Sequence, residues 1–208
     1  MKKGLKVLFQ GDSITDVNRN REHQDNANVS VALGHGYPLL ISSRFRADYP
    51  DSDLQFFDRG ISGNRVVDLY ARWKVDCLNL KPDVISILIG VNDTWHEFGS
   101  NNGVEVPRYE TVYRMLLQWT KESLPECKIV LIEPFVGNFG AVTDDWHDEI
   151  RARRAVVKKL AQEFDCTFIP FQDIMDAKLQ QAPYEYWLCD GVHPTIAGHQ
   201  LLADAWIQ

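Results

Sequence analysis

The stretch LKVLFQGDSITD, residues 5–16, begins as an apolar run and then breaks into small polar residues. A short apolar run that ends at turn residues is typical of a buried strand. Gly11, Asp12 and Ser13 follow at the point where this strand has to end. In open α/β sheets, ligands bind beyond the carboxyl ends of the strands. The stretch therefore predicts the first strand of such a sheet, with Ser13 at its functional edge.

The composition predicts one domain, residues 1–208. With 45% apolar residues, the chain can bury one substantial core. The formal net charge of −7 and the lack of a Lys/Arg stripe argue against nucleic acid or an anionic membrane as a partner.

The longest apolar runs fall short of the roughly 20 residues needed to cross a bilayer. The N-terminal apolar run is also too short for a signal peptide, so we expect a cytoplasmic protein.

Short apolar runs alternate with segments in which apolar residues recur three or four positions apart. The runs of strand type are residues 5–9, 54–57, 84–89, 129–132 and 167–169. The helical segments are residues 37–47, 66–77, 109–123, 145–163 and 194–206. This alternation predicts a three-layer α/β/α domain around a parallel sheet. Segments 98–106 and 135–142 are expected to be long surface loops.

Candidate catalytic residues follow the predicted strands or lie close to the C-terminus. A serine hydroxyl needs a neighbouring base before it can act as a nucleophile, and histidine is the usual base. His193 is the best candidate base for Ser13. In the sequence DGVH, Asp190 lies three residues before His193, close enough on a tight turn to orient the imidazole. Pro194 suits the first position of the last helix, where its missing N–H costs nothing.

Attack by serine on an ester carbonyl creates an oxyanion, which needs hydrogen-bond donors. Asn92 follows the third strand and offers a neutral amide N–H, while Asp93 is expected to brace the loop. Gly63 follows the second strand and offers a backbone N–H without a Cβ. The N–H of Ser13 itself is the third candidate donor.

These residues resemble the SGNH (GDSL-type) esterases. The blocks GDSIT, GISGN, GVND and DGVHP stand in that family's order between residues 11 and 194, and the marker residues are Ser13, Gly63, Asn92 and His193. Ile14 replaces the leucine of the GDSL name. The resemblance implies a flavodoxin-like fold with a central parallel sheet of about five strands. It also implies catalysis by Ser13, Asp190 and His193, with Ser13, Gly63 and Asn92 as the oxyanion hole.

A narrower resemblance points to bacterial acetylxylan esterases and related carbohydrate acetylesterases. It rests on GDSITD, LGHGYPLLISSRFRADYP, GISGNRVVDLYARW, IGVNDTW and DGVHPTIAGH. It implies deacetylation of xylo-oligosaccharides or a related carbohydrate, without a cofactor or metal, in a chain that can form a homo-oligomer. A short-chain lipolytic esterase, thioesterase or lysophospholipase of the same family is the alternative.

Two readings of another class stay open. A metal-dependent phosphoesterase could use oxygen and nitrogen donors near one edge, namely Asp12, Asp16, Asn92, Asp93 and His193. A non-catalytic sugar-binding module would keep a pocket without the reaction. Metal-ligand motifs such as HExxH do not occur in the sequence.

The remaining conspicuous side chains have more than one interpretation. Aromatic and polar residues near the predicted site could line the substrate pocket or pack in the core: Asp12, Trp95, His96, Tyr184 and Trp187. An acidic segment precedes a basic helix, as the helix dipole favours, and is read as solvated charge: Asp144, Asp145, His147, Asp148 and Glu149, before Arg151, Arg153, Arg154, Lys158 and Lys159. Four scattered cysteines are expected to be free thiols, and Cys189 could be reactive or simply a small apolar residue.

Overall fold

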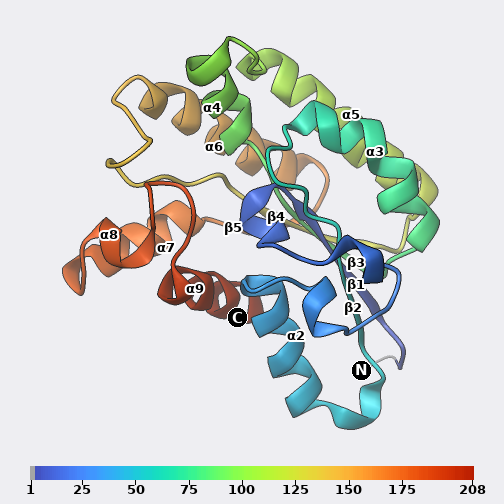
Figure 1. The fold of residues 1–208 in the computed structure, drawn as a ribbon. Helices are drawn as coiled ribbons and strands as arrows, with labels where there is room; N and C mark the ends of the chain where they lie inside the picture. Colours follow the sequence, from blue (N-terminus) through green and yellow to red (C-terminus); the bar gives the residue numbers. More distant parts are fainter. Residues whose placement is uncertain (1–2) are drawn as a thin grey trace.

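In the computed structural model, which describes residues 3–208, a single parallel sheet forms the centre of the molecule (Figure 1). Its strands are β1 (Lys6–Gly11), β2 (Gln55–Asp58), β3 (Val84–Leu88), β4 (Lys128–Ile132) and β5 (Thr167–Ile169). They lie in the order β2-β1-β3-β4-β5, and each neighbouring pair is parallel. The predicted parallel sheet of about five strands is confirmed.

Helices cover both faces of this sheet. They are α1 (Ser13–Asp16), α2 (Tyr37–Asp48), α3 (Val66–Asp76), α4 (Val91–Ser100), α5 (Val106–Ser123), α6 (Trp146–Glu163), α7 (Phe171–Ala177), α8 (Tyr184–Trp187) and α9 (Ile196–Ile207). Short 3₁₀ turns are η1 (Arg21–His23), η2 (Ser30–Ala32), η3 (Pro50–Ser52), η4 (Leu78–Leu80) and η5 (Lys178–Gln180). Helices α2, α7 and α9 pack on one face, and α3, α5 and α6 on the other (Figure 1). The predicted three layers are confirmed.

The strands have continuous apolar runs because helices cover both faces of the sheet. Phe9 of β1 joins the core beneath α2 and α9, whereas its neighbour Leu8 joins the core beneath α3 and α5. Both side chains are fully buried. A strand that is buried on both faces needs apolar residues at successive positions rather than in alternation. The core is therefore split into two clusters by the sheet.

The strand order places the polar segments of the sequence at one edge. From β1 the chain goes outward to β2 and then returns to β3 on the other side of β1. The boundary between β1 and β3 is thus the switch point at which open α/β sheets bind ligands. Residues 11–13 follow β1, residues 59–64 follow β2 and residues 90–93 follow β3.

The prediction of a long loop at 98–106 is wrong in part. Helix α4 runs through Ser100, and α5 begins at Val106, where Pro107 occupies the first turn. The start of α4 was hidden because Asn92, Asp93 and Thr94 are buried although they are polar. These side chains break the apolar periodicity by which helices are found in a sequence. The predicted loop at 135–142 contains neither helix nor strand, as expected.

The prediction that Pro194 opens the last helix is also wrong. Helix α9 begins at Ile196, and Thr195 is its N-cap, with the Thr195 side chain accepting a hydrogen bond from the Gly198 N–H at 3.2 Å. A threonine cap satisfies a free N–H of the first turn, which proline cannot do. Pro194 instead pairs with Leu188 in an isolated bridge.

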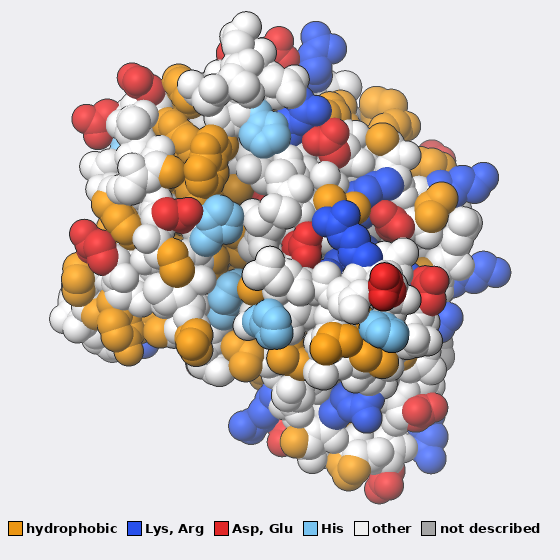
Figure 2. Space-filling model, in the orientation of Figure 1, with side chains coloured by type: hydrophobic (Ala, Val, Ile, Leu, Met, Phe, Trp, Pro, Cys, Tyr) orange, Lys and Arg blue, Asp and Glu red, His pale blue; other side chains and the backbone are white. Residues whose placement is uncertain are grey.

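The surface agrees with the charge pattern of the sequence. On the face seen in Figure 2, Lys and Arg side chains are interspersed with Asp and Glu and form no basic stripe. None of the helices within residues 3–208 is both long and apolar enough to span a membrane. The cysteines are free, as predicted: Cys77 and Cys127 are buried, Cys166 is half-buried and Cys189 is exposed.

Candidate active site

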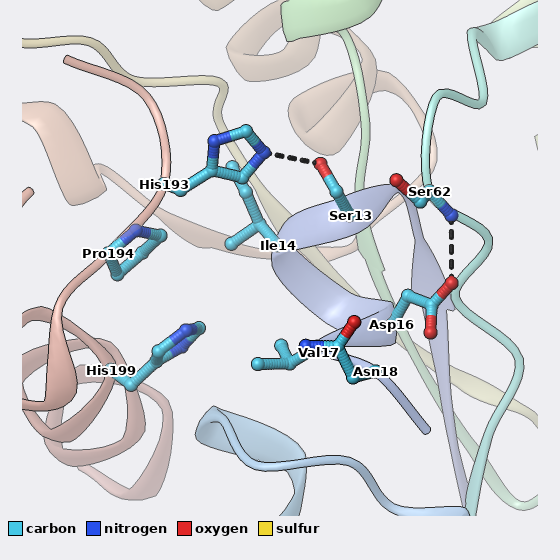
Figure 3. Close-up of a pocket in the computed structure, with 9 residues that line it drawn as sticks. All are labelled: Ser13, Ile14, Asp16, Val17, Asn18, Ser62, His193, Pro194 and His199. Atoms are coloured by element: carbon cyan, nitrogen blue, oxygen red, sulfur yellow. Dashed lines mark hydrogen bonds between the residues drawn. The ribbon is translucent and has the colours of Figure 1, made fainter. Parts of the chain in front are cut away.

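Ser13 lies at the start of a short helix directly after β1. The side chain of Asp12 caps this helix by accepting a hydrogen bond from the Ile14 N–H at 3.0 Å. The cap ends the strand and turns the chain, so that Ser13 stands at the switch point of the sheet. The Ser13 Oγ lies 2.8 Å from the Nε2 of His193, which is 180 residues further along the chain (Figure 3).

Asp190 holds the ring of His193 from the other side. Its Oδ2 lies 2.7 Å from the His193 Nδ1, and its Oδ1 accepts hydrogen bonds from the backbone N–H groups of Val192 and His193. Gly191 between them has a φ of +89°, which few other residues adopt. Partial burial opposes ionisation, but the hydrogen bonds from His193 and Val192 lower the pKa of Asp190 below its usual value. An ionised Asp190 keeps the proton on Nδ1 and leaves Nε2 free to accept one from Ser13.

The predicted loop 135–142 packs against the turn that carries Asp190. The Gly137 N–H donates to the Gly191 carbonyl at 2.8 Å, and the Ala141 N–H donates to the Asp190 carbonyl at 2.9 Å. At Gly140, a Cβ would lie 2.4 Å from the Asp190 carbonyl oxygen. The loop therefore borders the site and fixes the backbone that carries the Asp190 carboxylate.

The candidate donors Gly63 and Asn92 belong to neighbouring segments at the same edge. The Nδ2 of Asn92 donates to the Asn64 carbonyl at 3.1 Å. Gly63 has a φ of +81°, and its N–H has no hydrogen-bond partner in the part of the chain that the structure describes. The Ile61 N–H donates to the Gly11 carbonyl at 3.1 Å, which ties this segment to the end of β1. The segment that carries Gly63 is thus tied both to the end of β1 and to Asn92.

Asp16 and Arg72 hold this arrangement together, and the sequence did not show their role. The Asp16 Oδ2 accepts a hydrogen bond from the Ser62 N–H at 2.9 Å, linking helix α1 to the Gly63 segment (Figure 3). The Arg72 guanidinium donates to the Asn64 Oδ1 and to the Gly11 carbonyl. The only signal for Asp16 was its place in GDSITD, where it was considered as a metal ligand. Arg72 lies within GISGNRVVDLYARW, one of the blocks that carry the resemblance, but no role was predicted for it.

Asp93 braces the loop, as predicted. Both of its carboxylate oxygens lie within 3.2 Å of the Val66 N–H, at the first residue of α3. This contact joins the N-terminal ends of α3 and α4. The Asn92 side chain on α4 is thereby held against the segment that precedes α3.

A cavity of about 330 Å³ opens beside Ser13 and His193 (Figure 3). Its lining combines apolar side chains with hydroxyl, amide, carboxylate and imidazole groups: Ser13, Ile14, Asp16, Val17, Asn18, Ser62, His193, Pro194 and His199. His199 was not among the candidates, although it lies six residues after His193 in HPTIAGH. The sequence carried no signal for it, because residues 193–195 precede α9 and a spacing of six residues does not return a side chain to the same face of a helix.

The five predicted pocket residues are not in this lining. Trp95 comes nearest, since its ring centroid lies 5.8 Å from that of His193, and His96 follows it on α4. Of the two interpretations given for Tyr184 and Trp187, the structure favours packing against the core. Tyr184 lines a separate cavity of about 180 Å³ and donates its hydroxyl to Asp176, while the Trp187 indole N–H donates to the Ala182 carbonyl. Closeness to Asp190 in sequence did not place α8 at the serine.

Asp12 is likewise absent from this lining, because its side chain is buried. Its Oδ2 has no hydrogen-bond partner within residues 3–208. Burial, together with the nearby carboxylate of Asp93, raises the pKa of Asp12 to about 7. Burial also raises the pKa of Asp93 to about 7. The floor of the site thus contains two carboxyl groups that take up protons more readily than they would in water.

This burial predicts a pH-dependent effect of Asp12→Asn on stability. The folded state holds the Asp12 proton up to a higher pH than the unfolded chain, whose pKa is near 3.8. The stability from this proton is complete below about pH 4 and is lost as the pH rises through 7. Asparagine can still cap α1 and does not ionise. Between pH 5 and pH 8, Asp12→Asn should therefore gain about 1–3 kcal/mol in free energy of unfolding relative to the native chain.

The measurement is denaturant unfolding of both proteins at several pH values. The exposed Asp144, which has only a 3.9 Å contact with His147, supplies the control variant Asp144→Asn. Parallel pH curves for the native chain and Asp12→Asn would contradict the burial argument.

The acidic and basic cluster before and within α6 is largely solvated, with one correction. Exposed pairs such as Arg151 with Asp148 lie on the surface, as expected. Arg153, however, is fully buried. Its guanidinium donates to the Thr94 Oγ1 at 2.8 Å and to Glu149 at 2.9 Å. The first of these bonds joins α6 to α4. Within the described residues, no group of three or more His, Cys, Asp and Glu side chains is placed to hold a metal ion.

The chain is similar to known proteins over most of its length. The sequence pattern of the GDSL-like lipase/acylhydrolase family matches residues 9–201. An acetylxylan esterase from Geobacillus stearothermophilus is 35% identical over 99% of this chain and 93% of its own length.

Solved structures are similar to the chain in fold as well as in sequence. A GDSL-like lipase from Parabacteroides merdae has a TM-score of 0.95 and 43% identity, covering 100% of this chain and 95% of its own. The crystal structure of the Geobacillus acetylxylan esterase has a TM-score of 0.88 and 35% identity, covering 99% and 94% of the two chains. For that esterase, solved structures described as catalytic mutants replace a serine, a histidine or an aspartate by alanine.

Proposed function

Since the chain belongs to the GDSL-like lipase/acylhydrolase family and is a carboxylic ester hydrolase, we propose that it removes acetyl groups from carbohydrate esters through an acyl-enzyme. The observation that carries the mechanism is the hydrogen-bonded chain from the Ser13 Oγ through His193 to Asp190, with contacts of 2.8 and 2.7 Å. Three groups in this order form a nucleophile, a base and an orienter.

In the first step, Ser13 attacks the acetyl carbonyl while the His193 Nε2 takes the proton of the hydroxyl. The bond from the carbonyl carbon to the alcohol oxygen then breaks, and His193 returns the proton to the departing alcohol. Asp190, which holds the Nδ1 proton, stabilises the imidazolium that exists between these events. Its lowered pKa keeps it negative when that positive charge forms.

In the second step, water attacks the acetyl-serine with His193 again as the base, which releases acetate and restores Ser13. Both steps pass through an oxyanion. The donors proposed for it are the N–H groups of Ser13 and Gly63 and the side-chain amide of Asn92. The unpartnered Gly63 N–H supports this role, because a donor that is already prepared needs no rearrangement when the charge develops.

Removal of the Asn92 amide should slow the reaction without abolishing it. We expect Asn92→Ala to lower kcat on an aryl acetate by about 10²–10³-fold, with a smaller effect on KM, because the amide acts on charge that develops after binding. Steady-state kinetics give both constants.

The matched control is Asn79→Ala, since Asn79 is exposed on η4, outside the site. A loss in kcat of less than about threefold for Asn92→Ala would remove this side chain from the oxyanion hole.

The acetyl and carbohydrate parts of the proposal are supported by the relative, an acetylxylan esterase, and by the mixed polar and apolar lining of a small cavity. The test is ester hydrolysis on a panel: acetylated xylo-oligosaccharides, an aryl acetate, and aryl esters of longer acyl chains. Acetate release from the oligosaccharides, with rates that fall as the acyl chain grows, is the expected result. A rise in rate with acyl length would favour the lipolytic or thioesterase alternative.

A chelator added to the same assays addresses the metal-dependent alternative. The proposed mechanism draws its nucleophile and its base from side chains, so activity should survive the chelator. A sugar-binding module without catalysis does not accord with membership of a family of ester hydrolases.

A further inference from the structure

His199 reaches the cavity beside Ser13 from the second turn of α9 (Figure 3). Its side chain is buried against α2, where the ring stacks on Tyr37 at a centroid distance of 6.5 Å and an angle of 16°. Gly36 makes room for it, because a Cβ there would lie 2.7 Å from the His199 Cε1. The ring is therefore fixed in one orientation by its neighbours.

The hydrogen bonding of the ring determines its tautomer. The Tyr37 backbone N–H donates to the His199 Nδ1 at 3.3 Å, so this nitrogen carries no proton. Burial, together with the nearby His193, lowers the pKa of His199 to about 4. The ring is accordingly neutral near pH 7, and its one proton is on Nε2.

The Nε2–H of His199 has no partner in the described part of the chain, although the residue lines the cavity. Asp16, Asn18 and Ser62 contribute carboxylate, amide and hydroxyl groups to the same lining. A hydrocarbon chain in this space would leave the imidazole N–H without a hydrogen bond, which is costly in a water-excluded site. A hydroxyl group would accept that bond and could donate its own proton to a polar neighbour.

We infer that the cavity holds the alcohol part of the ester, that this alcohol carries a hydroxyl group next to the acylated oxygen, and that His199 donates a hydrogen bond from Nε2 to this hydroxyl. The inference rests on the proposed function and extends it from the acyl group to the alcohol. A vicinal diol monoester is the shared chemistry of an acetylated sugar ring and of an acylated glycerol. Sites built to bond a hydroxyl discriminate strongly against analogues that lack it.

The test compares two acetates that differ by one hydroxyl group: the monoacetate of vicinal trans-cyclohexanediol and cyclohexyl acetate. For the native chain we expect kcat/KM to favour the diol monoacetate by about tenfold or more. In His199→Asn, the side-chain oxygen can stand near the Nδ1 position and accept from Tyr37, while the donor at Nε2 is gone. The ratio of the two kcat/KM values should then fall to near one.

His199→Gln is the matched partner, because its longer amide can place an N–H near the Nε2 position and should recover part of the ratio. Equal losses on both acetates in His199→Asn, with the ratio unchanged, would show that His199 only supports the fold and would overturn the inference. Thermal unfolding of each variant identifies a folding defect. Failure of the native chain to cleave either acetate would instead overturn the proposed function, and the inference with it.

Glycerol monoacetate is the third substrate and distinguishes the two sources of the diol. A higher kcat/KM on the ring diol supports a sugar as the alcohol. A higher kcat/KM on glycerol monoacetate, again dependent on His199, supports the inference with a glyceride as the substrate.

Discussion

Ser13→Ala should lower kcat on acetyl esters by about 10⁴–10⁶-fold, the largest effect of any single substitution in this chain. The change removes one oxygen atom, whose structural contact is the 2.8 Å hydrogen bond to His193. The cap of α1 stays in place, because the Asp12 side chain bonds to the Ile14 N–H and not to Ser13. Stability should therefore change little, and the loss should lie in the chemical step.

The measurement pairs steady-state rates with mass spectrometry of enzyme quenched during turnover of an aryl acetate. The native chain should carry one acetyl group on Ser13, and Ser13→Ala should carry none. Ser43→Ala is the control, since Ser43 is an exposed serine of α2 that donates to the Leu39 carbonyl. Activity of Ser13→Ala within about tenfold of the native level would reject the acyl-enzyme mechanism.

The sequence predicted those parts of the molecule that depend on neighbours in the chain. The end of β1 at a small polar turn and the turn from Asp190 to His193 are local, and each could be predicted from a few residues. The sheet also followed, since runs buried on both faces have a clear signature.

The parts that were missed depend on contacts between distant segments. Arg72 reaches Asn64 and Gly11 only because α3 packs beside the end of β1. His199 enters the cavity because Gly36 leaves space for its ring and the Tyr37 N–H bonds to its Nδ1, although both residues lie more than 160 positions away in the sequence. Conversely, Tyr184 and Trp187 are near Asp190 in sequence, but α8 turns them toward another cavity and the core. Tertiary packing, which no local pattern encodes, decided these cases.

Asp190→Asn should lower kcat by about 10³–10⁴-fold although it keeps the shape of the side chain. The two oxygens of Asp190 have different partners. Oδ1 accepts the backbone N–H groups of Val192 and His193, and Oδ2 faces the His193 Nδ1. Asparagine must keep its single oxygen toward the two N–H donors, so its NH₂ group faces Nδ1.

This orientation forces His193 into the tautomer that cannot act as the base. With an NH₂ group opposite, Nδ1 becomes an acceptor and the ring proton moves to Nε2, where it points at the Ser13 hydroxyl. The effect should appear in kcat on every ester, whereas Asp144→Asn, at an exposed site, should have native rates. NMR of the imidazole nitrogens should show the proton on Nδ1 in the native chain and on Nε2 in Asp190→Asn. Native kcat together with a relocated proton would mean that the tautomer of His193 does not limit the reaction.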